Sequence, residues 1–234
     1  MPSNQRRVFL SAVIPTLNEQ DRLPDTIARA KAAGCDEVIV VDGGSHDETV
    51  RIASVAGADI VRETSAGRGG QLKRGSEAAR GDLIMMLHAD ITLPETARSD
   101  ILDAFDDQRV VATAFRVRFD SADRVLGISA WLSRFETTLT TFGDQAIVVR
   151  RDALTAIGGV PDEPLLEDVI LLRRLRAIGR VAKLSTAVTA SARRFEMTSP
   201  LRQQLTNAVI LARFGLGAKP KVLARAYRSL KTDD

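Results

Sequence analysis

The stretch EVIVVDGGSHDET, residues 37–49, passes from a run of apolar, mostly β-branched residues to a polar loop and then to the start of a helical pattern. Four consecutive apolar residues suit a strand that is buried on both faces, as in a parallel sheet covered by helices. Asp42 and the two glycines after it stand where this strand ends. Ligands of open α/β sheets bind beyond the carboxyl ends of the strands, so the stretch predicts both a fold class and a binding edge.

The same pattern repeats along the first half of the chain and predicts an α/β fold with a mainly parallel sheet. A longer extended run at 110–119 alternates apolar residues with Arg116 and Arg118, which predicts an edge or antiparallel strand with one face in water. Further strands are predicted at 8–14, 37–41, 59–61 and 83–87, and helices at 23–33, 48–56, 70–79 and 95–105.

The second half predicts more helix than strand. Residues 125–139 carry an apolar stripe at helical spacing, which we interpret as facing the core. A short strand at 146–149, a turn at Gly158 and Gly159 and a helix at 167–178 follow, and two helices at 201–214 and 220–230 end the chain. The stripe consists of Ile128, Trp131, Leu132, Phe135 and Leu139.

Length and charge suggest one domain with a basic C-terminal part. The 234 residues, 44% of them hydrophobic, can bury one substantial core. Residues 1–172 hold 27 acidic and 19 basic side chains, whereas residues 173–232 hold 14 basic ones and only Glu196 against them. The last helix is therefore basic and amphipathic. It could contact an anionic membrane, an acidic or lipid-linked acceptor or another subunit, but ordinary packing with a wet basic face is the preferred interpretation.

Other partners and compartments are disfavoured. The basic segment has few aromatic residues and no nucleic-acid motif, so we expect no nucleic-acid partner. Cys35 is the only cysteine, which excludes an intrachain disulfide. The apolar run at 208–212 stops at Arg213, far short of a membrane span. Pro15 ends the N-terminal apolar run before it reaches the length of a signal-peptide core. These features predict a cytoplasmic protein without a transmembrane segment.

Polar residues follow three of the predicted strands and should converge on one cleft. They are Thr16, Asn18 and Glu19 after the first strand, residues 42–47 after the second and 88–90 after the fourth. Asp42 could accept hydrogen bonds from a nucleotide base or ribose, or it could serve as a turn or cap residue.

A glycine-rich segment supplies a second candidate ligand contact. Gly67, Gly69 and Gly70 surround Arg68 just before a predicted helix. Here backbone amides, a guanidinium and the helix N-terminus could offset the charge of a diphosphate. No GxGxxG motif follows the first strand, which argues against a dinucleotide dehydrogenase.

Several segments, in order, resemble the signatures of family-two glycosyltransferases. They are VIPTLNE (13–19), VVDGGSHDET (40–49), AGRGGQLKRGSEAARGD (66–82), HAD (88–90) and GGVPDEPLLEDVILLRRLRAIG (158–179), and the match covers about residues 8–180. SARRFE (191–196) and LARAYR (223–228) are similar to a short subgroup labelled arsenosugar-biosynthesis glycosyltransferases. The resemblance implies the GT-A fold, with a nucleotide-binding half at about 1–120, an acceptor half at about 121–198 and basic C-terminal helices at about 199–234.

The resemblance also implies a reaction: inverting transfer of a sugar from a nucleotide diphosphate sugar, most commonly UDP-linked, to an acceptor hydroxyl. HAD stands where the family usually has DxD, so only Asp90 keeps the register of the carboxylate that binds Mn²⁺ or Mg²⁺. His88 could contact ribose, add a metal ligand or fill the loop. Thr16 and Glu19 would frame the base, and Asn18 is a further candidate contact to the nucleotide.

The acceptor side receives its roles in the same way. The resemblance makes Asp168 the general base and lets Glu167 orient the acceptor or the backbone, although both acids also suit the positive end of a helix. Asp144 and Gln145, in FGDQAIVV (142–149), are candidate sugar contacts or turn residues. Arg193 and Arg194 could reach the diphosphate or belong to a solvated basic face.

Two other functions share some of these features. A sugar-phosphate nucleotidyltransferase has a similar fold but carries a glycine-rich, basic loop after its first strand, where this chain reads PTLNE (15–19). A non-catalytic nucleotide-sugar-binding protein would explain HAD in place of DxD. The LED segment at 166–168 counts against it.

Overall fold

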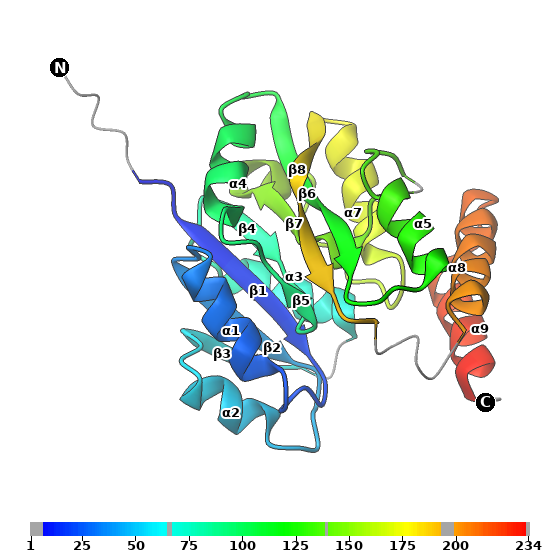
Figure 1. The fold of residues 1–234 in the computed structure, drawn as a ribbon, viewed down its shortest axis with the longest axis horizontal. Coiled ribbons are helices and arrows are strands. Elements are labelled where there is room, and N and C mark those ends of the chain that lie inside the picture. Colours follow the sequence, from blue (N-terminus) through cyan, green and yellow to red (C-terminus); the bar gives the residue numbers. More distant parts are fainter. Residues whose placement is uncertain (1–6, 65–66, 139, 193–198, 233–234) are drawn as a thin grey trace.

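A computed structural model describes residues 7–64, 67–138, 140–192 and 199–232. In these residues a single sheet of eight strands has the order β3-β2-β1-β4-β7-β6-β8-β5, and helices cover both of its faces (Figure 1). The strands are β1 (Leu10–Thr16), β2 (Glu37–Asp42), β3 (Ile60–Glu63), β4 (Leu83–Met86), β5 (Ile91–Thr92), β6 (Val110–Phe119), β7 (Ile147–Arg150) and β8 (Arg180–Ala190). The α-helices are α1 (Leu23–Ala32), α2 (Thr49–Val55), α3 (Arg68–Ala78), α4 (Ala97–Phe105), α5 (Arg124–Leu132), α6 (Arg151–Ala156), α7 (Glu167–Arg176), α8 (Pro200–Gly215) and α9 (Pro220–Thr232).

The predicted α/β fold with a mainly parallel sheet is confirmed. β1 pairs in parallel with β2 and β4, and β2 pairs in parallel with β3. β7 runs against both β4 and β6, and β5 runs against β8. The chain moves outward from β1 to β3 and then returns to add β4 on the other side. This reversal beside β1 is the kind of crevice in which α/β proteins bind ligands.

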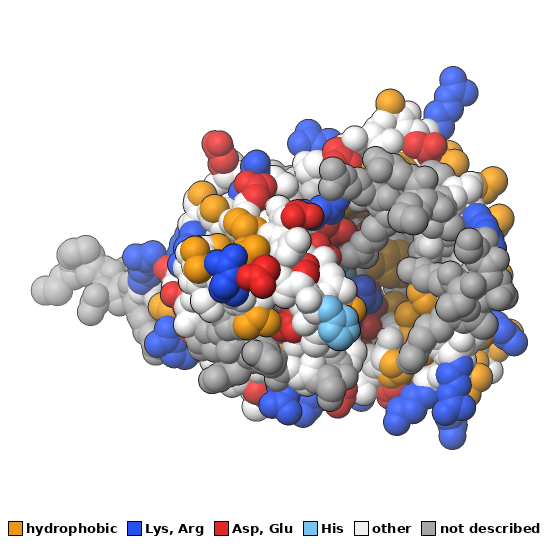
Figure 2. Space-filling view, turned by 90° about the horizontal axis from the view of Figure 1, so that it is seen from below, with side chains coloured by type: hydrophobic (Ala, Val, Ile, Leu, Met, Phe, Trp, Pro, Cys, Tyr) orange, Lys and Arg blue, Asp and Glu red, His pale blue; other side chains and the backbone are white. Residues whose placement is uncertain are grey.

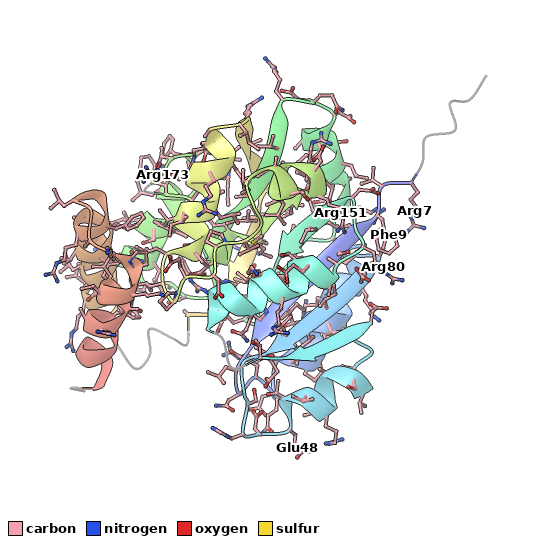
Figure 3. All side chains as sticks on the ribbon, turned by 180° about the vertical axis from the view of Figure 1, so that it is seen from behind. Arg7, Phe9, Glu48, Arg80, Arg151 and Arg173 are labelled. Carbon is pink, nitrogen blue, oxygen red and sulfur yellow. The ribbon has the colours of Figure 1, made fainter. Side chains whose placement is uncertain are left out.

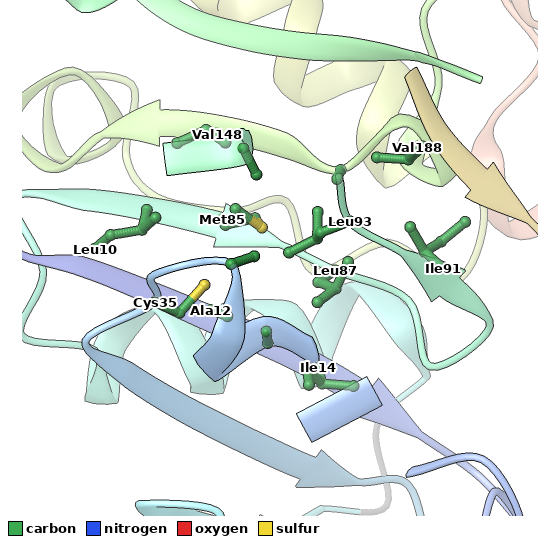
Figure 4. Packing of buried hydrophobic residues seen from close by; sticks show 14 of the residues in the cluster. Leu10, Ala12, Ile14, Cys35, Met85, Leu87, Ile91, Leu93, Val148 and Val188 are labelled. Atoms are coloured by element: carbon green, nitrogen blue, oxygen red, sulfur yellow. The ribbon is translucent and has the colours of Figure 1, made fainter. Parts of the chain in front are cut away.

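Alternating residues of the central strands enter two separate cores. Ile14 and Val40 point to the face covered by α1 and α4, where Met85 and Leu87 join them (Figure 4). Val13 lies on the opposite face, in a cluster with residues of α3, α6 and α7. Burial on both faces explains why the sequence shows continuous apolar runs rather than alternation in these strands.

A third apolar cluster attaches the C-terminal helices. Leu166 and Val169, at the start of α7, pack with Ile210 of α8 and Leu223 of α9. None of the helices in the described ranges combines the length and apolar character needed to cross a bilayer.

The amino-terminal edge of the sheet is held by arginines that serve structure. Figure 3 shows Phe9, Arg80 and Arg151 gathered at the start of β1. Arg151 Nε donates to the carbonyl of Gly81 at 2.7 Å, and Arg80 Nε donates to Glu37 Oε1 at 2.7 Å. These basic side chains lie at the edge opposite the predicted ligand loops.

One interpretation was confirmed in part and another was wrong. Residues 110–119 form a strand antiparallel to β7, as one alternative held, but β6 lies inside the sheet between β7 and β8. The stripe at 125–139 does not face the core: α5 ends at Leu132, and Ile128, Trp131 and Phe135 are exposed. Only Leu126 of α5 is buried, because the helix touches β6 along a narrow strip. Leu139 lies outside the described residues.

Two strands and one helix were missed: β5, β8 and α6. β5 is two residues long, and α6 is too short to show helical periodicity. The pairing of β8 with β6 contains shifts in register. At one of them Ala114 is paired with Lys183, whereas Arg116, two residues later, is paired with Ala187. A bulge of this kind breaks the period of two from which a strand is recognised.

The close packing of α3 on the sheet yields a testable prediction. A Cβ at Gly75 would lie 2.2 Å from Cγ1 of Val13. We expect Gly75→Ala to lower the free energy of unfolding by roughly 1–3 kcal/mol, because the added methyl group overpacks the interface. Gly127→Ala on α5 is the matched control, because its Cβ would meet nothing within 4 Å, and it should be neutral or slightly stabilising. Urea unfolding of both variants is the measurement, and unchanged stability of Gly75→Ala would contradict the packing.

Candidate active site

The loops after β1 and β2 interlock through side-chain bonds to backbone. Asn18, in the left-handed region at φ +56°, donates its N–H to Ser45 Oγ at 2.8 Å, and its Oδ1 accepts from the N–H of His46 at 2.9 Å. The N–H of Glu19 donates to Thr49 Oγ1 at 2.9 Å. The two loops therefore lie side by side, as predicted, at the carboxyl ends of β1 and β2. We call them the β1–β2 loop unit.

Asp42 organises the second loop from within. Its side chain is 1% exposed, and Oδ2 accepts from the N–H groups of Gly44 at 2.8 Å and Ser45 at 2.7 Å. Oδ1 accepts from the hydroxyls of Ser45 and, at 3.4 Å, Thr16. The alternative role of a turn residue is thus filled. Contact between Asp42 and a nucleotide stays a prediction, as do the nucleotide contacts of Thr16, Asn18 and Glu19.

Asp47 bonds to the backbone of the helix that follows its loop. Its Oδ1 accepts from the N–H of Thr49 at 3.0 Å, so it caps the first turn of α2.

Gln71 ties the first turn of α3 to the carboxyl ends of β1 and β2. Its Nε2 donates to the carbonyls of Thr16 at 2.7 Å and Val41 at 2.8 Å. Sequence reasoning missed this residue. The available signal was a polar amide directly after a glycine-rich segment, in a helical turn that the apolar pattern places against the sheet.

Arg68 connects the start of α3 to the start of α7. Arg68 Nε and Glu167 Oε1 form an ion pair, in which the Glu167 side chain is 2% exposed. Burial raises the pKa of Glu167, and Arg68 opposes that rise. Burial alone would lower the pKa of Arg68, but Glu167 and Asp168 raise it, so the guanidinium stays charged.

The two glycines that flank Arg68 differ in their surroundings. A Cβ at Gly69 would lie 2.5 Å from the carbonyl oxygen of Glu163, so the segment before α7 requires a glycine there. Gly67 is the N-cap of α3, and its Cβ would meet nothing within 4 Å. The predicted diphosphate contacts of Gly67, Arg68 and Gly69 stay predictions.

The reversed direction of β7 brings residues 143–145 to the same edge of the sheet as the loop after β4. Met86, at the end of β4, is paired with Ile147 at the start of β7. Residues just after β4 therefore lie beside residues just before β7. A Cβ at Gly143 would be 3.3 Å from His88 Nε2 and 3.2 Å from Asp168 Oδ2.

Asp168 lies at the junction where the residues after β4 meet the residues before β7. Two backbone groups hold its side chain there. The N–H of Gly143 donates to Oδ2 at 2.6 Å, and the N–H of Val169 donates to Oδ1 at 2.8 Å. Leu166, two residues earlier, adopts φ +64°, which turns the chain into α7. A cavity of about 10 Å³, about the room that one water needs, adjoins these side chains. It is lined by Leu72, Met86, His88, Gly143, Ile147, Val160, Glu167, Asp168 and Leu171.

Three carboxylates influence one another at this edge. Burial, followed by the charges of Asp168 and Asp90, raises the pKa of Asp144 to about 6, while Arg68 and Lys183 oppose the rise. Oδ1 of Asp144 is buried and has no hydrogen-bond partner among the residues that the structure describes. Such an orphaned oxygen suits a cation. In the described part of the chain, however, no three acidic, His or Cys side chains already have the spacing of a metal site, so a bound cation would need ligands from elsewhere.

Gln145 and Lys183 lie beside these carboxylates and are bonded to each other. The amide of Gln145 donates to the carbonyl of Thr140 at 2.7 Å and accepts from Lys183 Nζ. Burial lowers the pKa of Lys183 to about 8. Both polar ends of Gln145 are thus used within the protein, and its contact with sugar stays a prediction. Sequence reasoning missed Lys183 because it lies on the unrecognised strand β8.

The carboxyl edge thus gathers most of the predicted residues in two linked groups. Thr16, Asn18, Glu19 and Asp42 form the first, and His88, Asp90, Asp144, Glu167 and Asp168 the second, with Gln71 and Arg68 on α3 between them. Figure 2 faces this edge and shows a hollow with acidic and basic side chains. Arg193 and Arg194 lie outside the described residues.

Comparison with known proteins gives this site a family. The sequence profile of glycosyl transferase family 2 matches residues 11–154. The chain belongs to glycosyl transferase family 2. An undecaprenyl-phosphate 4-deoxy-4-formamido-L-arabinose transferase of Shewanella sediminis is 34% identical over 137 residues, which is 53% of this chain and 41% of that protein. A PGL/p-HBAD biosynthesis glycosyltransferase of Mycobacterium bovis is 39% identical over 96 residues, 37% of each chain. The chain spans less than half the length of these curated relatives.

Solved structures show the same fold. A mannosyltransferase of Pyrobaculum calidifontis, in complex with GDP-Man and Mn²⁺, superposes with a TM-score of 0.70 at 18% identity, covering 95% of this chain and 70% of that one. Glucosyl-3-phosphoglycerate synthase of Mycobacterium tuberculosis, with Mn²⁺, UDP-glucose and phosphoglyceric acid, gives 0.61 at 20% identity, covering 86% and 78%. The predicted GT-A fold is confirmed, and the arsenosugar subgroup stays a prediction.

The raised pKa of Asp144 yields a prediction about stability and pH. The pKa of this carboxyl group is higher in the folded protein than in the unfolded chain, so ionising it costs more free energy in the folded state. The free energy of unfolding therefore falls as pH rises from 4 through 6. We expect Asp144→Asn, measured in EDTA by urea unfolding, to gain about 2 kcal/mol of stability relative to wild type between pH 4 and pH 8. A stability difference that does not change with pH would show that Asp144 ionises normally.

Proposed function

We propose that the chain is an inverting glycosyltransferase that moves a sugar from a nucleotide diphosphate sugar, UDP-linked by preference, to an acceptor hydroxyl. The observation that carries the proposal is the placement of Asp168, which shares a junction with His88 and Gly143 and lies within electrostatic reach of Asp144. Membership of family 2 supplies the reaction type. We assign donor binding to residues 1–120, acceptor binding to 121–198, and a cytoplasmic setting consistent with the buried free thiol of Cys35.

The proposed reaction uses Asp168 as general base. The acceptor oxygen attacks the anomeric carbon, the bond from that carbon to the diphosphate breaks, and the hydroxyl proton passes to a carboxylate oxygen of Asp168. Each carboxylate oxygen accepts one backbone N–H and keeps a second lone pair for this proton. The two backbone bonds fix the direction of the side chain. Glu167 acts as a positioning residue, because its ion pair with Arg68 holds the start of α7.

Asp90 and Asp144 fit a divalent cation, either Mn²⁺ or Mg²⁺. Both ions prefer oxygen ligands, and two carboxylates leave room for the donor phosphates to complete the coordination shell. The orphaned Oδ1 of Asp144 supports this assignment. When bound, the cation would stabilise charge on the leaving diphosphate. Arg68 and the N-terminus of α3 would add positive potential on the same side.

One assay separates the proposal from its two alternatives. Purified protein is incubated with a panel of nucleotide sugars, with and without Mn²⁺, and the products are identified. We expect nucleoside diphosphate, with Mn²⁺ stimulation that is lost in Asp90→Asn and kept in the exposed control Asp103→Asn. Pyrophosphate would indicate a nucleotidyltransferase. Donor binding without any turnover would indicate a non-catalytic binding protein.

The role of Asp168 has its own test. We expect Asp168→Asn to slow turnover on the order of 10²-fold to 10⁴-fold while donor affinity stays nearly unchanged, because only the proton acceptor is lost. Turnover is measured by release of nucleoside diphosphate, and donor affinity by thermal shift. Asp152→Asn is the matched control, since Asp152 also accepts from the N–H of the next residue but lies exposed on α6. Wild-type turnover in Asp168→Asn would remove this residue from the mechanism.

A further inference from the structure

Exposed apolar side chains concentrate on one part of the molecule. Twelve large hydrophobic residues of the described chain are exposed, and nine of them lie between residues 128 and 135 or between 201 and 222. α5 and α8 contact each other, so the two groups are neighbours. Trp131 is 51% exposed and packs edge-on against Phe135 at 5.1 Å between ring centroids. Isolated exposed apolar residues need no explanation, but a concentration of this size marks a binding surface.

A groove runs along the C-terminal helices within this region. It has a volume of about 390 Å³ and lies between α8 and α9. Apolar side chains, among them Leu201, Leu205, Val209 and Leu223, form most of its walls, and Arg202 and Arg213 stand at its rim. We call the exposed apolar residues 128–135 and this groove the α5–α8 surface.

The charge of the surrounding chain decides which occupant fits. Residues 199–232 contain seven basic side chains and no acidic one. Arg213, Lys219, Lys221 and Arg225 are exposed. A second copy of this chain docking by the same face would bring like charges together, which opposes association. An occupant that is both anionic and apolar complements the surface, and an anionic bilayer offers this combination over an extended area.

We propose that the α5–α8 surface docks the protein on an anionic lipid bilayer. Trp131 and Phe135 enter the interface between headgroups and acyl chains, where aromatic rings are favoured, and the basic residues of α8 and α9 face lipid phosphates. The third apolar cluster joins Leu166 and Val169, on either side of Glu167 and Asp168, to α8 and α9. Docking would therefore hold the bilayer beside the candidate active site. The inference does not depend on the catalytic role of Asp168.

Binding to vesicles tests this proposal with a probe that the chain already contains. Trp131 is the only tryptophan, so its fluorescence reports on this surface alone. We expect the full chain to sediment with vesicles of equimolar phosphatidylcholine and phosphatidylglycerol, with a blue shift of Trp131 emission, and to remain unbound to phosphatidylcholine alone. Binding should weaken as salt is raised, because exposed charges are screened.

Two sets of variants separate charge from apolar contact. Lys219→Gln, Lys221→Gln and Arg225→Gln together should weaken binding on the order of 10²-fold, at about 1 kcal/mol for each basic residue near the surface. Leu205→Gln with Val209→Gln should weaken binding roughly tenfold through lost apolar burial. The matched controls, Arg29→Gln with Arg51→Gln and Val55→Gln, change exposed residues of α1 and α2 and should bind as wild type.

Four outcomes would overturn the proposal. They are absence of sedimentation, equal binding to both vesicle types, equal loss in the control variants, and sedimentation without a change in Trp131 emission. A doubled mass in light scattering with Trp131 already shielded before vesicles are added would instead assign the surface to a second copy. Nucleoside diphosphate release in solution is recorded separately, so failure to dock and failure to catalyse are distinguished.

Discussion

The ion pair between Arg68 and Glu167 is the constraint on which the site depends, because it joins the first turn of α3 to the first turn of α7. The carboxylate of Glu167 is buried, and a buried charge without its partner is strongly destabilising. The close approach of Gly69 to the backbone of Glu163 leaves little room for these segments to shift. Asp168 follows Glu167 directly, so its position beside Gly143 and His88 is fixed by the same pair.

Around this pair the site balances clustered acids against clustered bases. The charges of Asp90 and Asp168 both disfavour ionisation of Asp144, and Arg68 and Lys183 offset part of that effect. The balance is incomplete, as the raised pKa of Asp144 shows. An acidic group that is costly to ionise in the folded protein is stabilised when it binds a cation or a proton. This is a familiar property of functional sites and a poor source of stability.

The sequence predicted the first half of the fold well and the second half poorly. Residues 38–41 and 83–87 are apolar throughout because helices cover both faces of these strands, and few other structures produce that pattern. The stripe from Ile128 to Phe135 has the spacing of a buried helix, yet most of it faces outward. Periodicity shows that residues share a face and does not show what covers that face. Lys183 and Gln71 escaped notice because their importance comes from partners far away in the chain.

The order of the motifs along the chain predicted which loops form the site. It did not predict which side chains contact one another there. The loops after β1, β2 and β4 were placed correctly, since parallel strands end at the same edge. Asp42 was placed at that edge, but its three hydrogen bonds to Gly44 and Ser45 depend on backbone angles at residues 43–45 that sequence does not reveal. The effect of Asp90 on Asp144 depends on β7, whose reversed direction could not be read from four apolar residues.

That reversed strand has a consequence for how such a protein can change over evolutionary time. Residues 143–145 lead into β7 and lie beside the loop after β4. They take no part in the hydrogen bonds that join the loops after β1 and β2. Insertions or replacements in residues 140–145 would reshape one wall of the candidate site without moving β1, β2 or β4. One scaffold can therefore keep its β1–β2 loop unit unchanged while the opposite wall of the site diverges among descendants.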